Sequence, residues 1–258
     1  MQFYWMDHRL IVLAMVAALL VASAIGHRLG ARSVRASDSR LSLMSGIGVA
    51  MLGLLGLLLG FTLSMAIARY DARRDVIVSE SNAIGTLWLR AGFLQEPLRE
   101  KLRGALRDYT EARIVLGRFI AADDTLRAAR SKSETLHASI WSVVERADRP
   151  EISNATLSSV IVAANELIDL HERTLASIEN TLPARVFLLL LGVAALAMGF
   201  VFWAFGAASQ RGFMAMLLLA CLIGTVLMLI MDLSRPQRSS LDVATLERVR
   251  DMMTKADR

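Results

Sequence analysis

Long apolar blocks and long polar stretches alternate along the chain. Four blocks contain no charged residue, and they cover residues 10–25, 43–68, 186–208 and 213–231. A bilayer core of about 30 Å needs roughly 20 apolar residues in a helix, because lipid offers no partner to an unpaired backbone group. The pattern therefore predicts four membrane-spanning helices, of which the first is the shortest unless it begins near residue 3.

The first block has a second interpretation, as a cleaved signal peptide. Residues 22–24 (Ala-Ser-Ala) have the small side chains of a signal-peptidase site. The segment before the block, however, contains Asp7 and a single arginine, whereas a signal peptide begins with net positive charge. Tyr4 and Trp5 also suit a membrane interface, so we expect an uncleaved span.

The polar stretch between the second and third blocks predicts a helical domain. Residues 69–185 contain many helix formers, few glycines and no alternating strand pattern. No linker follows the second block, so its helix should continue toward Phe93. Further helices are expected to start at Pro97, at Asp123 or Asp124, and at Ser153 or Asn154. The expected fold class is all-α, with spans in 1–68 and 186–233, the helical domain in 69–185, and a polar tail in 234–258.

Charge is distributed unevenly along the chain. The formal net charge is +5, yet residues 69–185 contain equal numbers of acidic and basic residues. The excess therefore lies near the ends of the spans and in the tails. Because the sequence has no basic stripe with interleaved aromatic residues, nucleic acid is not an expected partner.

The arginines give two conflicting indications of orientation. With four spans, both termini and the domain share one side of the membrane, and the loop 26–42 lies on the other. Positive residues favour the cytoplasmic side. The loop carries Arg28, Arg32, Arg35 and Arg40, whereas the domain side carries Arg69, Arg73, Arg74, Arg185, Arg235, Arg238, Arg248 and Arg250. The larger set favours a cytoplasmic domain and cytoplasmic termini.

Few residues are arranged for catalysis or metal binding. The single cysteine, Cys221, lies within the fourth block, and the four histidines are scattered along the sequence. No Ser/His/Asp, Cys/His or phosphate-loop arrangement is present. Apolar positions at helical spacing should form a bundle core, and the carboxylates should lie on solvated helix faces near arginines. We therefore expect no enzyme, no metal site and no cofactor.

The second block is unusual in its small residues. Gly46, Gly53, Gly56, Gly60 and Ser64 recur near one face of the expected helix. Such a face either lets another helix approach closely or lines a pore that bulky side chains would obstruct. No Asp, Glu, Lys, Arg or His lies inside any of the four blocks, which argues against a proton pump or a coupled transporter.

The end of the fourth block carries a short polar motif. Asp232 and Arg235 can pair at the membrane interface, and Pro236 is expected to stop the helix. We treat these three residues as an interfacial motif.

The order of motifs over residues 43–243 resembles the bestrophin-like domain family, whose members are similar to bestrophin channels. The resemblance rests on Gly60-Phe61, on 68–74 (ARYDARR), on 80–87 (ESNAIGTL) with Arg90, on 106–109 (LRDY) with Arg113, and on 231–236 (MDLSRP). Bestrophins are pentameric ion channels whose second helix lines the pore, with a cytoplasmic helical domain and cytoplasmic termini. The resemblance implies a homo-oligomeric ion channel of the bacterial cytoplasmic (inner) membrane.

This resemblance gives candidate roles to residues of the second span. The pore-lining or packing candidates are Leu52, Gly53, Gly56, Leu57, Gly60, Phe61, Ser64 and Met65. Three arginines are expected at the inner mouth, where they would favour anions, and these are Arg69, Arg73 and Arg74.

One departure from the bestrophin pattern concerns the pore neck. Bestrophins carry bulky apolar side chains at successive i+4 positions before a tyrosine-centred motif. Counting back from Tyr70 by that register reaches Gly56, Gly60 and Ser64. Either the register shifts to Leu57, Phe61 and Met65, or the hydrophobic gate is absent.

The main alternative is a non-conducting membrane sensor or scaffold protein. A helical domain between two spans is also the layout of chemoreceptor input modules. That alternative lacks an output domain, because only a tight turn, a fourth span and a short tail follow the third span.

The cytoplasmic orientation can be tested with single cysteines. In a Cys221→Ser background, Arg127→Cys should resist an impermeant thiol reagent applied to intact cells, whereas Ser33→Cys should react. Labelling of the cysteine at position 127 from outside would reverse the orientation.

Overall fold

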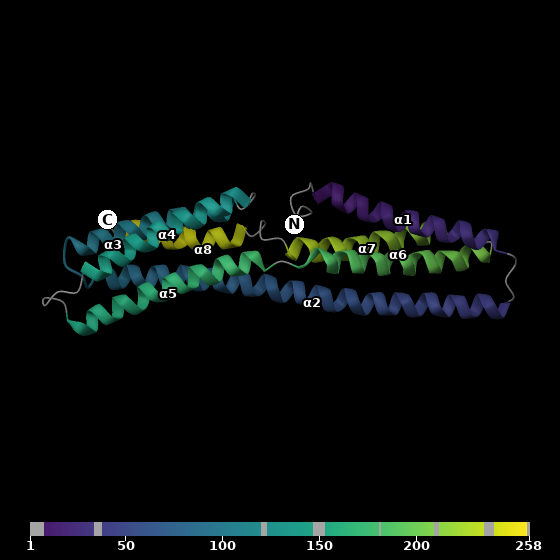
Figure 1. Cartoon of the computed structure of the whole chain (residues 1–258), viewed down its shortest axis with the longest axis horizontal. Helices are drawn as coiled ribbons and strands as arrows, with labels where there is room; N and C mark the ends of the chain where they lie inside the picture. The colour runs from purple at the N-terminus through teal and green to yellow at the C-terminus, as the bar shows by residue number, and fades with distance from the viewer. Residues whose placement is uncertain are drawn as a thin grey trace. The chain divides into compact units, whose positions relative to one another are not determined.

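The computed structural model describes residues 8–33, 38–119, 123–146, 153–180, 182–208, 212–234 and 240–256, and in these ranges the α-helix is the one kind of regular secondary structure (Figure 1). The helices are α1 (His8–Arg32), α2 (Asp38–Ala91), α3 (Leu98–Phe119), α4 (Asp123–Arg146), α5 (Asn154–Glu179), α6 (Ala184–Ala207), α7 (Phe213–Ser234) and α8 (Ser240–Ala256). The chain divides into a membrane unit (Met1–Ala68 and Leu182–Arg235) and an extramembrane unit (Arg69–Thr181 and Pro236–Arg258). The long helix α2 contributes to both units.

The all-α fold with four candidate spans is confirmed. Four described helices are long and apolar enough to cross a membrane, over Leu10–Arg32, Ser42–Ala91, Ala184–Ala207 and Phe213–Ser234. Helix α2 continues past the apolar block without a break and ends at Ala91. Two predicted starts also agree, because α3 begins directly after Pro97 and α4 begins at Asp123.

The start of α5 follows from a side-chain cap. Ser153 is the N-cap residue, and its Oγ accepts a hydrogen bond from the backbone N–H of Thr156 at 3.2 Å. This bond satisfies one of the amide groups that the first turn of any helix leaves unpaired.

In the membrane unit, α6 lies against α1 and also contacts α7 (Figure 1). Gly26 and Gly30 of α1 face the backbone of α6, and Gly206 of α6 faces the backbone of α1. A Cβ atom at Gly26 would collide with the Gly199 carbonyl oxygen, and one at Gly30 with the Trp203 carbonyl oxygen. In lipid, where burying apolar surface gives little driving force, small residues favour helix association because they permit such close contact.

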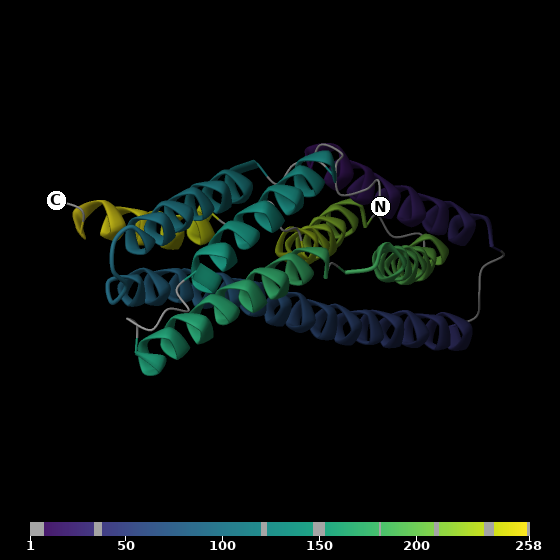
Figure 2. The same cartoon turned by 60° about the vertical axis from the view of Figure 1, so that its left-hand side comes forward.

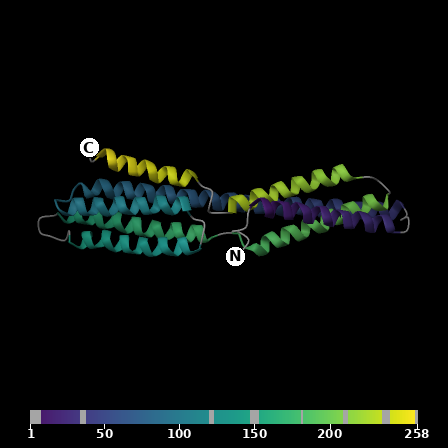
Figure 3. The same cartoon turned by 90° about the horizontal axis from the view of Figure 1, so that it is seen from above.

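In the extramembrane unit, the second part of α2, α3, α4, α5 and α8 share one hydrophobic core (Figure 2, Figure 3). Its largest fully buried side chains include Trp88 and Ile84 from α2, Tyr109 and Leu106 from α3, and Ile140 from α4. Because these residues recur at helical spacing, each helix buries one stripe and exposes the opposite face.

Helix α8 lies where the sequence predicted a polar tail. Val243, Leu246 and Met253 are buried in the core of the extramembrane unit. Helix α8 packs closely against α3 at Gly117. A Cβ atom at that position would lie only 2.9 Å from Val243 Cγ2, so the absence of a side chain makes room for Val243. The spacing of these three apolar residues, at i, i+3 and i+10, is that of one helix face, so the segment 240–256 belongs to the bundle.

The glycine contact between α1 and α6 predicts a clear difference between two matched substitutions. Gly26→Ala should destabilise the membrane unit by about 1–3 kcal/mol, as overpacking does. Gly192→Ala on α6 is the control, because no atom lies within 4 Å of a Cβ atom at that position. Alanine is the better helix former by about 1 kcal/mol, so the control should be neutral or stabilising. Thermal unfolding in detergent would show the contrast, and equal melting temperatures would contradict it.

Candidate functional site

One face of α2 is not covered by any other described part of the chain. We define this open face of α2 by its exposed residues Gly46, Gly53, Leu57, Gly60, Ser64, Asp71, Asp75 and Asn82. Successive members are three, four or seven residues apart, so they form one stripe on a helix with 3.6 residues per turn. The opposite side carries buried residues such as Leu55, Leu59, Ala66, Arg73 and Glu80.

Most of the predicted pore-lining or packing residues are exposed. Gly53, Gly56, Leu57, Gly60, Phe61, Ser64 and Met65 are exposed, and Leu52 is half-buried. In the part of the chain that the structure describes, a Cβ atom at Gly46, Gly53, Gly56 or Gly60 would meet no atom within 4 Å beyond its own helix backbone. Among the described residues of a single chain, these glycines therefore take no part in helix packing, whereas Gly26 and Gly30 of α1 and Gly206 of α6 do.

The three predicted inner-mouth arginines point in different directions. Arg73 is only 7% exposed and lies on the buried side of α2. Arg69 is half-buried, and only Arg74 is exposed. Two carboxylates, Asp71 and Asp75, are exposed beside Arg74 on the open face. The charged members of the open face, Asp71 and Asp75, are thus both acidic.

The predicted interfacial motif is described only in part. Asp232 lies in the last turn of α7, where it is partly exposed. Arg235 and Pro236 lie outside the described residues.

A buried polar cluster, which the sequence did not predict, joins four helices of the extramembrane unit. We define it by Glu80 of α2, Tyr109 and Arg113 of α3, His137 of α4, and His171 and Thr174 of α5. Glu80 is fully buried, and Arg113 is 4% exposed. The expectation that the carboxylates lie on solvated faces is therefore wrong for Glu80. His137 and His171 are far apart in the sequence, but the fold brings their rings into contact.

The Glu80 carboxylate accepts hydrogen bonds at both of its oxygens. Arg113 donates from Nε to Oε1 at 2.6 Å and from Nη2 to Oε2 at 2.9 Å. Tyr109 Oη donates to Oε1 at 2.6 Å, and Thr174 Oγ1 lies 2.8 Å from Oε2. A buried charge is tolerated when it is paired and hydrogen-bonded in this way.

The ionisation of this pair follows from its surroundings. Burial alone would raise the pKa of Glu80, but the adjacent guanidinium of Arg113 and the hydrogen bonds it receives hold that pKa well below its usual range. Burial alone would lower the pKa of Arg113, and the Glu80 carboxylate reverses this effect. Burial and the negative charge of Glu80 raise the pKa of Tyr109, so the phenol stays protonated and acts as a donor.

The two histidines extend the cluster to α4 and α5. Tyr109 Oη lies 3.0 Å from His171 Nδ1. Because the tyrosine proton is directed at Glu80, the imidazole N–H of His171 must donate to the tyrosine oxygen. The His137 ring packs edge-on against His171, with ring centroids 4.6 Å apart, and it is tilted by 35° against the Tyr109 ring, with centroids 5.4 Å apart. Burial, followed by the charge of His171, lowers the pKa of His137 to about 4.

A different signal in the sequence could have located the cluster. Glu80 is four residues before Ile84 and seven before Leu87, both of which are fully buried, so helical spacing already puts it on the core face. Tyr109 and Arg113 are likewise four residues apart on one face of α3. What the sequence could not supply is which helices meet at this level of the bundle.

The cluster is not arranged as a metal or catalytic site. No group of three or more potential ligands is found among the described residues. Glu80, Tyr109, Arg113, His171 and Thr174 are linked by hydrogen bonds to one another, and the cluster is packed into the core. Its chemistry is that of a structural ion pair that fixes the relative positions of helices.

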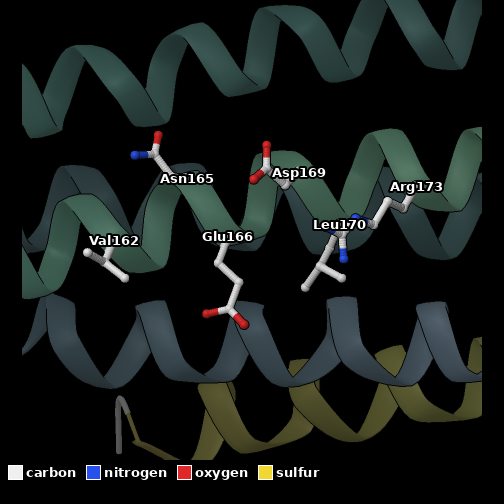
Figure 4. A pocket seen from close by; sticks show the side chains of 6 residues that line it. All are labelled: Val162, Asn165, Glu166, Asp169, Leu170 and Arg173. Carbon is white, nitrogen blue, oxygen red and sulfur yellow. The ribbon is translucent and has the colours of Figure 1, made fainter.

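An open hollow along α5 carries no site either. Figure 4 shows that Asn165 and Asp169 project from one edge of the helix and Glu166 from the other. Its remaining lining residues, Val162, Leu170 and Arg173, also belong to α5. A site that binds a small molecule needs polar groups that converge, usually from several elements, and this arrangement does not provide them.

The buried ion pair predicts a large cost for neutralising one partner. Glu80→Gln leaves Arg113 without a counter-charge and should destabilise the extramembrane unit by about 3–5 kcal/mol. Glu100→Gln is the matched control, since its pair with Arg107 is exposed and should contribute only about 0–1 kcal/mol. Denaturant unfolding of the full chain, followed by tryptophan fluorescence, measures both. A similar effect of the two substitutions would contradict the role assigned to the cluster.

The fold is shared with solved membrane proteins. A crystal structure of a variant described as a membrane protein matches with a TM-score of 0.69 and 14% identity, covering 95% of this chain and 99% of the other. A variant of a bacterial bestrophin homologue from Klebsiella pneumoniae matches with a TM-score of 0.66 and 12% identity, covering 97% and 96%. No curated protein matches the chain.

These structural similarities establish the fold alone, because the identities are low. The sequence itself matches a bestrophin-like domain over residues 12–245, which is most of its 258 residues. The matched range includes the whole of α2, all residues of the open face and all residues of the buried polar cluster. The chain therefore belongs to the bestrophin-like domain family.

Proposed function

We propose that copies of this chain assemble into an ion channel whose path follows the open face of α2. The observation that carries the proposal is the continuous exposure of this face from Gly46 to Asn82. A helix face toward lipid needs only apolar side chains, and glycine is not required there. A face that surrounds an ion path, by contrast, benefits from small side chains and hydroxyl groups, such as those of Gly53, Gly60 and Ser64.

Family membership supports the assembly. Bestrophins are pentameric, and their second helix lines the pore, so homo-oligomerisation through α2 is the corresponding arrangement for this chain. The uncovered glycines of α2 would either face the ion path or allow close approach of a neighbouring copy. We further propose that the extramembrane unit and both termini are cytoplasmic, in agreement with the arginines on that side.

The charges on the open face lead us to propose cations as the permeating ions. The anion preference expected from the sequence requires Arg73 and its neighbours to face the path. Arg73 is buried, and Asp71 and Asp75 are exposed on the open face with Arg74 at its edge. Repeated around an oligomer, two carboxylates per copy would concentrate cations at the mouth and repel anions.

The proposal predicts a change in selectivity when the two carboxylates are neutralised. The purified oligomer in planar bilayers under a salt gradient should reverse near the cation equilibrium potential. Asp71→Asn with Asp75→Asn should move the reversal potential toward that of the anion, because the local excess of cations is lost. Asp108→Asn, an exposed carboxylate on α3, is the control and should leave the reversal potential unchanged.

Three results would count against the proposal. Anion selectivity in the unsubstituted protein would indicate that arginines, and not Asp71 and Asp75, determine which ions permeate. An unchanged reversal potential in the double variant would indicate that the open face does not line the ion path. Reproducible silence from an oligomer of verified mass would favour a non-conducting sensor or scaffold.

A further inference from the structure

Within the polar cluster, His137 of α4 contacts the other members through aromatic ring packing and not through hydrogen bonds. Glu80, Tyr109, Arg113, His171 and Thr174 are linked by hydrogen bonds. His137 instead packs edge-on against His171 and tilted against Tyr109, and its buried Nε2 atom makes no hydrogen bond within the described part of the chain. The imidazole of α4 is therefore held as a neutral aromatic ring.

The groups facing His137 act in both directions on a positive charge: His171 and Arg113 oppose it, and the Glu80 carboxylate favours it, while burial of the ring is the largest effect and opposes it. Arg113 of α3 carries a fixed positive charge, and its Nη1 atom is buried without an acceptor among the described residues. His171 of α5 directs its Nδ1 proton to Tyr109. Glu80 of α2 is the sole carboxylate in the cluster, and both of its oxygens already accept hydrogen bonds. A proton on His137 would thus add charge beside a guanidinium without gaining a free acceptor.

We propose that the His137–His171 contact is an acid-sensitive latch, and that protonation of His137 releases α4 from the extramembrane bundle. The apolar residues Ile140, Val143 and Val144 also hold α4 in the core, so release is a shift in a local opening equilibrium rather than unfolding of the whole unit. The latch does not require that the protein conducts ions, so it is independent of the function proposed above.

The direction of the pH effect follows from proton binding in the two states. In the closed bundle, burial and the neighbouring His171 lower the pKa of His137 to about 4, from 6.5 in a solvated chain. Between these values the opened state binds more protons than the closed one, so acidification favours opening. Above pH 6.5 the latch is fully closed, and its contribution is lost as the pH falls toward 4. One titrating group can change the opening equilibrium by at most about tenfold per pH unit.

Hydrogen–deuterium exchange of the full-length protein in nanodiscs tests the latch. After correction for the intrinsic exchange rate, protection of amides in Asp123–Arg146 should fall as the pH is lowered from 6.5 to 4, by up to about tenfold per unit. Amides of Leu98–Phe119 serve as the internal reference and should change much less. His137→Gln should flatten the profile of α4, whereas His27→Gln, which removes a histidine from the membrane unit, should leave it unchanged.

Each outcome decides for or against the latch. Constant protection of α4 in the unsubstituted protein overturns the proposal, and so does an equal loss of protection in α3 and α4. Should His137→Gln fail to fold, His137→Phe retains the ring contact with Tyr109 and His171 and cannot titrate. A pH profile that survives in His137→Phe would assign the acid sensitivity to another group.

Discussion

The buried Glu80 carboxylate restricts how the helices of the extramembrane unit can pack. A charge removed from water is tolerated only where hydrogen-bond donors surround it, and few helix arrangements provide those donors. Its desolvation is unfavourable by several kcal/mol unless donors surround it. Those donors come from α3 and α5, on residues 29 to 94 positions further along the chain. Arrangements of the helices that separate Glu80 from Arg113 are therefore strongly disfavoured, whereas apolar contacts alone would tolerate small rotations and shifts.

Much of the fold could be predicted from the sequence, since it depends on signals that are local in the chain. Spans follow from the length of apolar runs, and the starts of α3 and α5 follow from Pro97 and Ser153, whose chemistry acts within one turn. Helix α8 was missed because its apolar positions are few and lie in a polar tail. The sequence shows that they share a face, but it does not show that a groove in α3, at Gly117, receives them.

The glycines also show that a sequence does not reveal which helices contact each other. Those of α2 and those of α1 and α6 look alike in sequence, as small residues at helical intervals in apolar helices. In the structure, Gly26 and Gly30 lie against another backbone, whereas a Cβ atom at Gly53 or Gly60 would meet no atom of another described element within 4 Å. Which glycines pack is decided by the relative positions of helices that are distant in sequence, and spacing within one helix contains no information about that.

The buried ion pair also determines which charges α2 presents to its surroundings. Arg73 precedes Glu80 by seven residues, close to two full turns, so both lie on the same side of the helix. Asp71 precedes Glu80 by nine residues, or two and a half turns, and therefore lies on the opposite side. Once Glu80 is bound to Arg113 in the core, α2 cannot rotate, Arg73 is buried with it, and Asp71 with Asp75 is directed outward. The sign of the charge on the open face thus depends on a single carboxylate that never reaches that face.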